Sequence, residues 1–301
     1  MSATRLPLRF QVGARTLFAV ERRLVRVALS LDDALAARLP TLPPLDRDAD
    51  GYAITSLPIA QLGAVAGGAL IAFVRQRYTR HFIDLTTGYD AYLAALSANT
   101  RSGIKRKAKK LAQASGGALD VRRFRTPAEI EAFHAIARDL SRKTYQAKLL
   151  GGGLPEDARF VQAMLTLAAA DAARAWLLYV EEQPVAYLYC PVEHGTVRYD
   201  HVGHDPDFAD LSPGSVLQME AMRDLFADGC HHRFDFTEGE GQHKRQFATD
   251  GVVCADLLLL RPTLGNRATV AALGAFDGGM AQAKQLVNRL GLHAIAKRIR
   301  R

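Results

Sequence analysis

The stretch Arg198–Thr249 constrains the fold of this chain more than any other part of the sequence. It begins with β-forming residues that stop at Asp205-Pro206, and a second apolar strand pattern follows at Arg233–Thr237. Between the two, Ser212-Pro213-Gly214-Ser215 combines an N-cap residue, a proline suited to the first helical position and a glycine, and a one-sided apolar stripe runs on to Gly229. The pattern predicts a strand, a helix and a strand. Because the free N–H groups and the dipole of a helix start both favour anions, we expect Ser212, Gly214 and Ser215 to bind a phosphate or pyrophosphate.

Two motifs allow a comparison with known families. Ser212-Pro213-Gly214 opens a helix, and twenty residues after the glycine come Phe234-Asp235-Phe236 and, past a short glycine loop, Lys244. Upstream, Tyr92–Leu111 carries Thr100-Arg101 and a run of lysines and arginines. In this order and spacing the motifs resemble the GNAT superfamily of acyltransferases, and within it the branch of the Fem-type aminoacyl transferases and the CelD-like proteins. The resemblance covers roughly residues 90–260 and implies an acyltransferase of GNAT type.

The expected fold class is α/β with a mixed sheet, the GNAT fold. From Leu119 to Leu260 the pattern predicts a strand, two helices, three strands, a helix, a strand, a short helix and a last strand, with the three central strands at Ala175–Glu181, Val185–Val192 and Thr196–Gly203. In the Fem-type branch two such units lie side by side. The resemblance therefore implies a degenerate N-terminal GNAT-like unit with a basic helix over residues 1–115, the acyltransferase domain over 116–262, and a basic helical extension over 263–301 that is interrupted near Asp277-Gly278-Gly279.

Composition and cysteine usage point to the cytoplasm. With 49% hydrophobic and 23% charged residues the chain is an ordinary globular protein, and no apolar run reaches the length of a membrane span. The first ten residues lack the apolar core of a signal peptide. Cys190, Cys230 and Cys254 are widely spaced in apolar segments, which favours buried, reduced thiols over a disulfide or a metal site. A cytoplasmic location is expected, with peripheral association with the inner membrane left open.

The positive charge is concentrated in two segments. Arg101–Arg125 holds nine Lys or Arg and one Asp, and Lys284–Arg301 holds six Lys or Arg and no acid, in a chain whose net charge is +8. A solvated helix face explains many charge runs, but five of the six residues of Lys105–Lys110 are basic, more than one face holds. We therefore expect an anionic partner, and the candidate donor-binding residues of this helix are Arg101, Lys105 and Arg106.

The candidate partners are coenzyme A phosphates, an acidic acyl-carrier protein and an anionic membrane surface. Nucleic acid is disfavoured because no aromatic residues are interleaved with the cations. The pattern of Lys284–Arg301 is that of a basic amphipathic helix, which can lie in an anionic membrane interface or pack its apolar side on the protein body.

Acyl transfer from a thioester to an amine needs a base, donors for the oxyanion and alignment of two substrates. The resemblance implies that the acyl-pantetheine enters between two neighbouring parallel strands that separate, here Thr196–Gly203 and His232–Thr237. Polar side chains near the ends of these strands are the candidates: Asp200, His201, His204, Asp235, Glu238, His243 and Lys244. The catalytic set expected from them is His201, Asp235, Glu238, His243 and Lys244, with no metal.

Each member of this set has an alternative role. Asp235 takes part in catalysis or orients substrate, or it only caps a neighbouring turn or pairs with Arg198. His201 is a general base or a core histidine, and Glu238 is a base or a loop carboxylate. Lys244 neutralises an oxyanion or a phosphate, and His243 stands where the family often has tyrosine, so its role stays open. His231-His232 is not expected to bind a metal, because neighbouring side chains of a strand point to opposite faces.

The function expected is an N-acyltransferase that moves an acyl group from acyl-CoA or an acyl-carrier protein to a primary amine. A long-chain sphingoid amine, as in bacterial ceramide formation, is one acceptor. The alternatives are an acetyl or aminoacyl transferase acting on an amino sugar or cell-envelope precursor, and a non-catalytic adaptor that binds a carrier protein or a membrane. The sequence does not determine the acceptor, the acyl chain length or the form of the donor.

Overall fold

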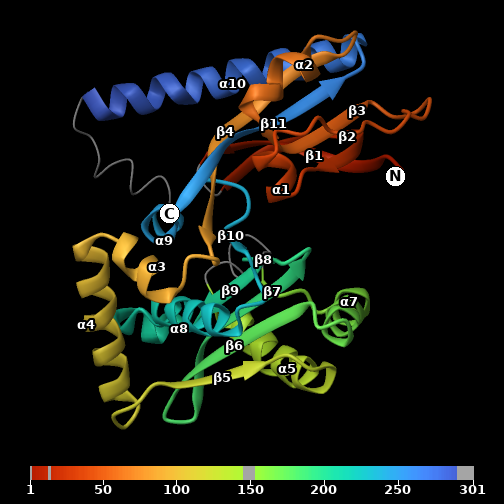
Figure 1. Ribbon diagram of the computed structural model, residues 1–301. Helices are drawn as coiled ribbons and strands as arrows, with labels where there is room; N and C mark the ends of the chain where they lie inside the picture. Colours follow the sequence, from red (N-terminus) through yellow and green to blue (C-terminus); the bar gives the residue numbers. More distant parts are fainter. Residues whose placement is uncertain (1, 13–14, 145–152, 290–301) are drawn as a thin grey trace. The chain divides into compact units, whose positions relative to one another are not determined.

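The computed structural model describes residues 2–12, 15–144 and 153–289 (Figure 1). The chain forms two compact units, Met1–Thr79 with Val252–Arg301, and Arg80–Gly251. Strand β4 (Ile71–Asp84) runs from the first unit into the second. This division differs from the boundaries expected at residues 115 and 262. The last strand returns to the N-terminal unit, and the basic helix belongs to the unit of residues 80–251.

The first unit is a mixed sheet with the strand order β1-β2-β3-β11-β4. Strands β1 (Thr4–Val12) and β2 (Arg15–Ala28) form an antiparallel hairpin, β3 (Gly51–Pro58) lies parallel to β2, and β11 (Asp250–Leu260) lies antiparallel to β3. Three short helices connect them: α1 (Leu31–Leu35), η1 (Ile59–Gln61) and α2 (Leu62–Ala66).

Helix α10 (Leu264–Arg289) follows the last strand and is continuous. The interruption expected near Asp277-Gly278-Gly279 is therefore wrong. Two glycines weaken a helix by about 1 kcal/mol each. Leu273 lies fully buried in a cluster with Leu258 and Leu260, and this packing holds the helix in place. Residues 290–301, which hold four of the six cations of Lys284–Arg301, lie outside the described residues.

The second unit is a mixed sheet with the order β4-β10-β8-β7-β6-β5, and β9 also pairs with β7. Strands β5 (Asp120–Phe124), β6 (Ala173–Val180), β7 (Gln183–Glu193) and β9 (His201–His204) pair antiparallel, whereas β8 (Thr196–Arg198) and β10 (Arg233–Asp235) pair in parallel. The expected α/β class with a mixed sheet is confirmed. The strand expected over Thr196–Gly203 is divided into β8 and β9 at Tyr199–Asp200.

Helices cover both faces of this sheet, so every residue of β6 is buried. On one face Ala175 and Leu177 pack with α5 (Pro127–Lys143) and α7 (Ala158–Ala169). On the other face Trp176 and Leu178 pack with α8 (Pro213–Asp228). The remaining helices of the unit are α3 (Tyr89–Ala95), α4 (Ala98–Ala114), η2 (Pro206–Leu211) and α9 (Gln242–Phe247).

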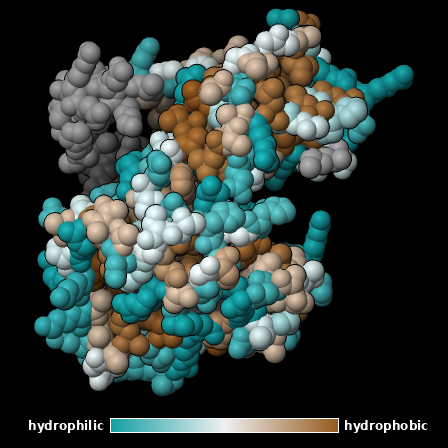
Figure 2. Space-filling view, viewed as in Figure 1, coloured by the Kyte–Doolittle hydropathy of each residue, from teal (hydrophilic) through white to brown (hydrophobic). Residues whose placement is uncertain are grey.

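Helix α4 is the expected basic helix. It buries Leu111 in the same cluster as α8, while Lys105 and Arg106 are exposed on a largely hydrophilic surface (Figure 2). This packing joins the helix to the second unit.

Two further expectations concern burial. Cys190 and Cys254 are buried as expected, but Cys230 is exposed, because it follows the C-cap Gly229 of α8 outside the apolar core. In the part of the chain that the structure describes, no helix combines the length and apolar character needed to cross a bilayer.

Candidate active site

The site is built on the separation of two parallel strands. Strand β8 follows β10 in register as far as the pair Arg198 and Asp235, and the N–H of Tyr199 then donates to the carbonyl of Asp235 at 2.9 Å. Beyond this bond β9 pairs with β7, whereas the N–H of Phe236 donates to the carbonyl of His81 at 3.0 Å. The two strands for which the resemblance implied a separation thus diverge after Tyr199.

A cavity of about 700 Å³ opens where the strands diverge. Its walls come from the end of β8 and β9, the residues after β10, the start of α8 and the short helix α9. The residues that line it are Thr144, Tyr187, Tyr199, Asp200, His201, Val202, Gly203, His204, Pro206, Ala209, Ser212, Pro213, Gly214, Ser215, Gln218, Phe236, Thr237, His243, Lys244 and Phe247. The structure therefore brings together Ser212, Gly214, Ser215, His201, His243 and Lys244 from the expected set.

The start of α8 faces this cavity without a side-chain cap. Ser212 stands at the N-cap in the left-handed conformation with φ 52°, and its hydroxyl makes no capping hydrogen bond. Pro213 fills the first helical position. A Cβ at Gly214 would have nothing nearer than Nδ1 of His204 at 3.8 Å, so the backbone there is open. First-turn N–H groups and the dipole of a sixteen-residue helix make this end of the cavity suited to an anion.

The titratable groups along the walls are partly desolvated. Burial raises the pKa of the Asp200 carboxyl, an effect that the Arg198 guanidinium at 3.1 Å opposes. Burial lowers the pKa of His201 to about 4, and its ring lies edge-on to Phe160 with ring centres 5.2 Å apart. The imidazole of His201 is therefore neutral at neutral pH and a weak base, which favours the packing role over the general base.

Helix α9 places two more polar groups on the wall. Burial lowers the pKa of His243, and the neighbouring Lys244 lowers it further. Burial also lowers the pKa of Lys244, against the opposing charges of Asp235 and Glu238. Nζ of Lys244 donates to the carbonyl of Glu238 at 2.6 Å, so the lysine holds the loop after β10. A cation at this position can neutralise an oxyanion or a phosphate.

Asp235 and Glu238 do not line the cavity. Asp235 is 1% exposed, and its carboxylate accepts hydrogen bonds from Nε and Nη2 of Arg80 at 3.1 and 2.5 Å and from the N–H of Thr237 at 2.8 Å. The expected alternative pairing of Asp235 with Arg198 is wrong, since Arg198 pairs with Asp200. Nothing in the sequence around Asp235 pointed to Arg80, which lies 155 residues away.

The basic residues expected to bind the donor lie outside the cavity lining. Nη1 of Arg101 donates to the carbonyl of Ala94 at 3.0 Å and to that of Leu96, so this side chain satisfies the end of α3. Lys105 and Arg106 are exposed on α4. The helix does reach the cavity rim indirectly, because Nζ of Lys110 donates to the carbonyl of Asp210 in η2 at 3.1 Å.

Sequence reasoning missed two wall residues. One is Tyr187, a buried core residue that also lines the cavity, where its hydroxyl donates to Oγ of Ser141 at 3.1 Å. Gln218 was not singled out, although it is a polar residue four positions after Gly214 within an otherwise apolar helix face. That spacing was the signal that could have identified it.

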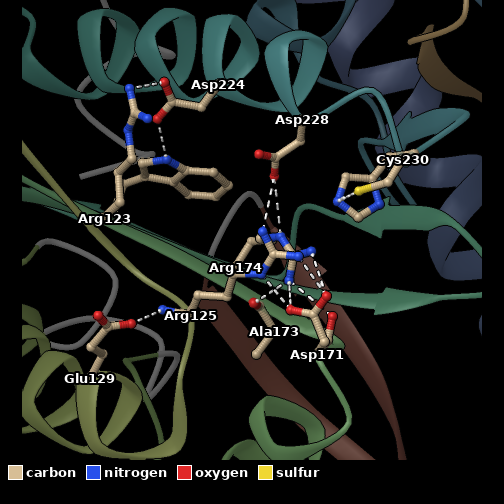
Figure 3. Close-up of polar contacts among 11 residues, drawn as sticks. Arg123, Arg125, Glu129, Asp171, Ala173, Arg174, Asp224, Asp228 and Cys230 are labelled. Carbon is tan, nitrogen blue, oxygen red and sulfur yellow. Dashed lines mark hydrogen bonds and ion pairs between the residues drawn. The ribbon is translucent and has the colours of Figure 1, made fainter.

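A separate cluster holds metal-ligating side chains. Ligand atoms of Asp228, Cys230 and His231 lie within 4.8 Å of one another, and Sγ of Cys230 is 3.5 Å from Nε2 of His231 (Figure 3). The Asp228 carboxylate, however, lies 3.6 Å from Nε of Arg174 and 3.8 Å from Nη1 of Arg125. Two guanidinium groups neutralise this carboxylate and oppose a bound cation, so the cluster provides no argument for a metal.

Comparison with known proteins agrees with this geometry. Residues 98–245 match the family model described as an acetyltransferase (GNAT) domain, and no curated protein matches the chain. Among solved structures, the C-terminal domain of a putative lysylphosphatidylglycerol synthetase from Agrobacterium fabrum is similar, with 13% identity, a TM-score of 0.51, and coverage of 75% of this chain and 71% of that one. FemX is similar with 9% identity, a TM-score of 0.51, and coverage of 86% of this chain and 89% of that one. At these identities the likeness concerns the fold alone.

The matched domain spans the helix α4, the separating strands, the open start of α8 and Lys244. By this match, residues 98–245 form a GNAT-type acyltransferase domain.

Proposed function

We propose that this protein is an N-acyltransferase that takes an acyl group from the phosphopantetheine thioester of coenzyme A or of an acyl-carrier protein and transfers it to a primary amine. The observation that carries the proposal is that the uncapped start of α8 and the polar side chains of Asp200, His243 and Lys244 line the same cavity. An anion-binding end and a set of proton-transfer groups in one space match a phosphorylated thioester and an amine.

In this reaction the thioester carbonyl lies between the diverging strands and the amine attacks it. Asp200 accepts the amine proton, because its raised pKa brings this carboxylate closer to the operating pH than an ordinary aspartate. The new C–N bond forms, the C–S bond breaks, and the sulfur leaves as a thiolate. A thiolate is a good leaving group because the pKa of a free thiol is only about 8.5. Lys244 stabilises the oxyanion.

The acceptor that we propose is a long-chain amine of the sphingoid type. Two lines support a lipid or envelope acceptor: solved structures with this fold are named FemX and a putative lysylphosphatidylglycerol synthetase, and the pattern of Lys284–Arg301 is that of a basic amphipathic helix. The second line rests on sequence alone, because residues 290–301 lie outside the described residues. An amino sugar or another cell-envelope amine is the second candidate acceptor.

The exposed cations of α4 favour an anionic donor carrier. Lys105, Arg106 and Lys109 have exposed side chains, and the helix contains no acidic residue that would neutralise them. An acidic acyl-carrier protein that docks here would deliver its phosphopantetheine past η2 to the start of α8. Coenzyme A, in contrast, would bind through its phosphates at the start of α8 and would not require the cations of α4.

Mass spectrometry of reactions with mixed acyl-CoAs or acyl-carrier protein, each offered with sphinganine, amino acids and amino sugars, tests the activity. We expect an N-acylated sphinganine as the main product. An absence of acylated amine with every donor contradicts the enzymatic proposal and leaves a binding adaptor. A strong preference for a water-soluble amine contradicts the lipid acceptor alone.

Flotation with anionic liposomes tests the membrane half of the proposal. The full chain should float with phosphatidylglycerol vesicles, and a chain without residues 284–301 should remain in solution. Equal flotation of the two chains would show that this segment does not bind the membrane.

A further inference from the structure

Gln218 carries a polar group that has no hydrogen-bond partner in the described part of the chain. The residue is 3% exposed, and within residues 2–12, 15–144 and 153–289 Nε2 has no hydrogen-bond acceptor. Few buried amide donors in folded proteins lack an acceptor, because such a group loses its water without a replacement. Gln218 also lines the cavity. The missing acceptor is therefore to be sought in whatever fills this space.

The position of Gln218 on α8 indicates where that acceptor lies. Gly214 and Ser215 precede it by four and three residues, so the three positions share one helix face, and all three line the cavity. One helical turn rises about 5.4 Å. The amide thus stands about one turn along the helix from the anion-binding start.

The nearby hydroxyl of Tyr187 does not provide an alternative explanation. Tyr187 is a residue of β7, and its hydroxyl donates its own proton to Oγ of Ser141 at 3.1 Å. Gln218 is in addition surrounded by apolar neighbours on its helix, because Leu217 and Met219 are buried in the core. A buried amide donor between two core positions of a helix needs a hydrogen-bond acceptor.

We propose that Gln218 donates a hydrogen bond to an oxygen of the pantoyl unit of the acyl donor, either its hydroxyl or its amide carbonyl. This inference rests on the proposed function. In phosphopantetheine the pantoyl unit follows the phosphate directly, so a phosphate on the N–H groups of the α8 start places these oxygens about one helical turn away. Gln218 is a binding residue that selects a pantetheine thioester over a simpler thioester, and it does not touch the reacting carbon.

A series of shortened donors tests the assignment. Acyl-CoA contains the phosphate and the pantoyl unit, acyl-pantetheine contains the pantoyl unit without the phosphate, and an acyl N-acetylcysteamine thioester contains neither. Gln218→Met keeps the volume of the side chain and removes its donors. We expect this variant to raise KM about tenfold for the first two donors with kcat nearly unchanged, and to leave kcat/KM for the third unchanged.

Two control variants separate binding from damage. Gly214→Asp acts at the phosphate, so it should raise KM for acyl-CoA and leave acyl-pantetheine unaffected, whereas Gln218→Met affects both. Met219→Leu, in the core beside Gln218, should change neither KM and should match Gln218→Met in thermal stability within a few degrees.

Calorimetric titration with coenzyme A provides a readout that does not need turnover. The parent should bind coenzyme A about ten times more tightly than Gln218→Met. Equal affinities, or an equal loss of activity by Gln218→Met with the N-acetylcysteamine thioester, would overturn the pantoyl assignment. If the parent binds coenzyme A and discriminates as described but acylates no amine, the proposed function fails while the binding role of Gln218 stands.

Discussion

Replacing Asp235 by asparagine distinguishes a structural carboxylate from a catalytic one. Asp235 belongs to the motif on which the family resemblance rests, and the resemblance implies a catalytic role for it. In the structure it is buried against Arg80, whose side chain is 4% exposed, and it does not line the cavity. The two roles predict opposite outcomes for Asp235→Asn.

The structural role predicts a large loss of stability. Removal of one member of a buried ion pair costs about 3–5 kcal/mol, because the remaining charge stays desolvated. With an m-value of about 2 kcal/mol per molar urea, a loss of about 4 kcal/mol lowers the unfolding midpoint by about 2 M. Activity per folded molecule should stay within tenfold of the parent.

Tryptophan fluorescence in urea reports unfolding of the structural unit that contains Asp235. Trp176 is the one tryptophan of the sequence, it is 3% exposed, and it lies in the unit of residues 80–251 together with Arg80 and Asp235. The double variant Arg80→Met with Asp235→Leu should recover much of the loss, because it removes both charges. Glu156→Gln, which breaks the exposed pair with Arg142, is the matched control and should not move the midpoint measurably.

The reasoning is refuted if Asp235→Asn unfolds at the same urea concentration as the parent. A stable variant that has lost about 100-fold or more in kcat would restore Asp235 to the catalytic set.

Three further predictions concern the cavity. Gly214→Asp should raise KM for a phosphorylated donor without lowering the melting temperature, because a side chain there enters open space, and an unchanged KM with a lower melting temperature would show a packing residue instead. Gly203→Ala should destabilise the protein by about 1–3 kcal/mol in thermal unfolding, since its Cβ would lie 2.4 Å from Cε1 of Tyr187, and a neutral effect would contradict the close approach. The unfolding free energy should fall as the pH decreases from about 6.5 to about 4, because His201 takes up a proton in this range in the unfolded chain but not in the folded one. Urea titrations at several pH values measure this slope, and His201→Phe should flatten it. An equally steep slope for the variant would contradict the lowered pKa.

The local patterns of the sequence determined the framework of the site. The glycine-bearing start of α8 and its apolar stripe, the strands on either side of it, and the lysine after the glycine loop are all short-range features. The structure contains each of them, with the strand before α8 divided into β8 and β9. They are predictable because turn chemistry and periodicity depend on residues within one or two turns of each other. The resemblance to the GNAT superfamily also identified the two parallel strands that separate at the site.

The roles of other side chains depended on contact partners that lie far away in the sequence and that no local pattern could reveal. Arg80 takes the Asp235 carboxylate, and Arg101 turns to the end of α3 instead of the cavity. The glycines near residue 278 do not break α10, because core packing of Leu273 outweighs their helix propensity.

The physical reason is the range of the interactions. Periodicity tells which face of an element is buried, but the residue that lies opposite on another element is fixed only when the elements pack. Gln218 shows this most clearly: the sequence places a glutamine on an apolar helix, and only the tertiary structure shows that its Nε2 faces the cavity without an acceptor among the described residues.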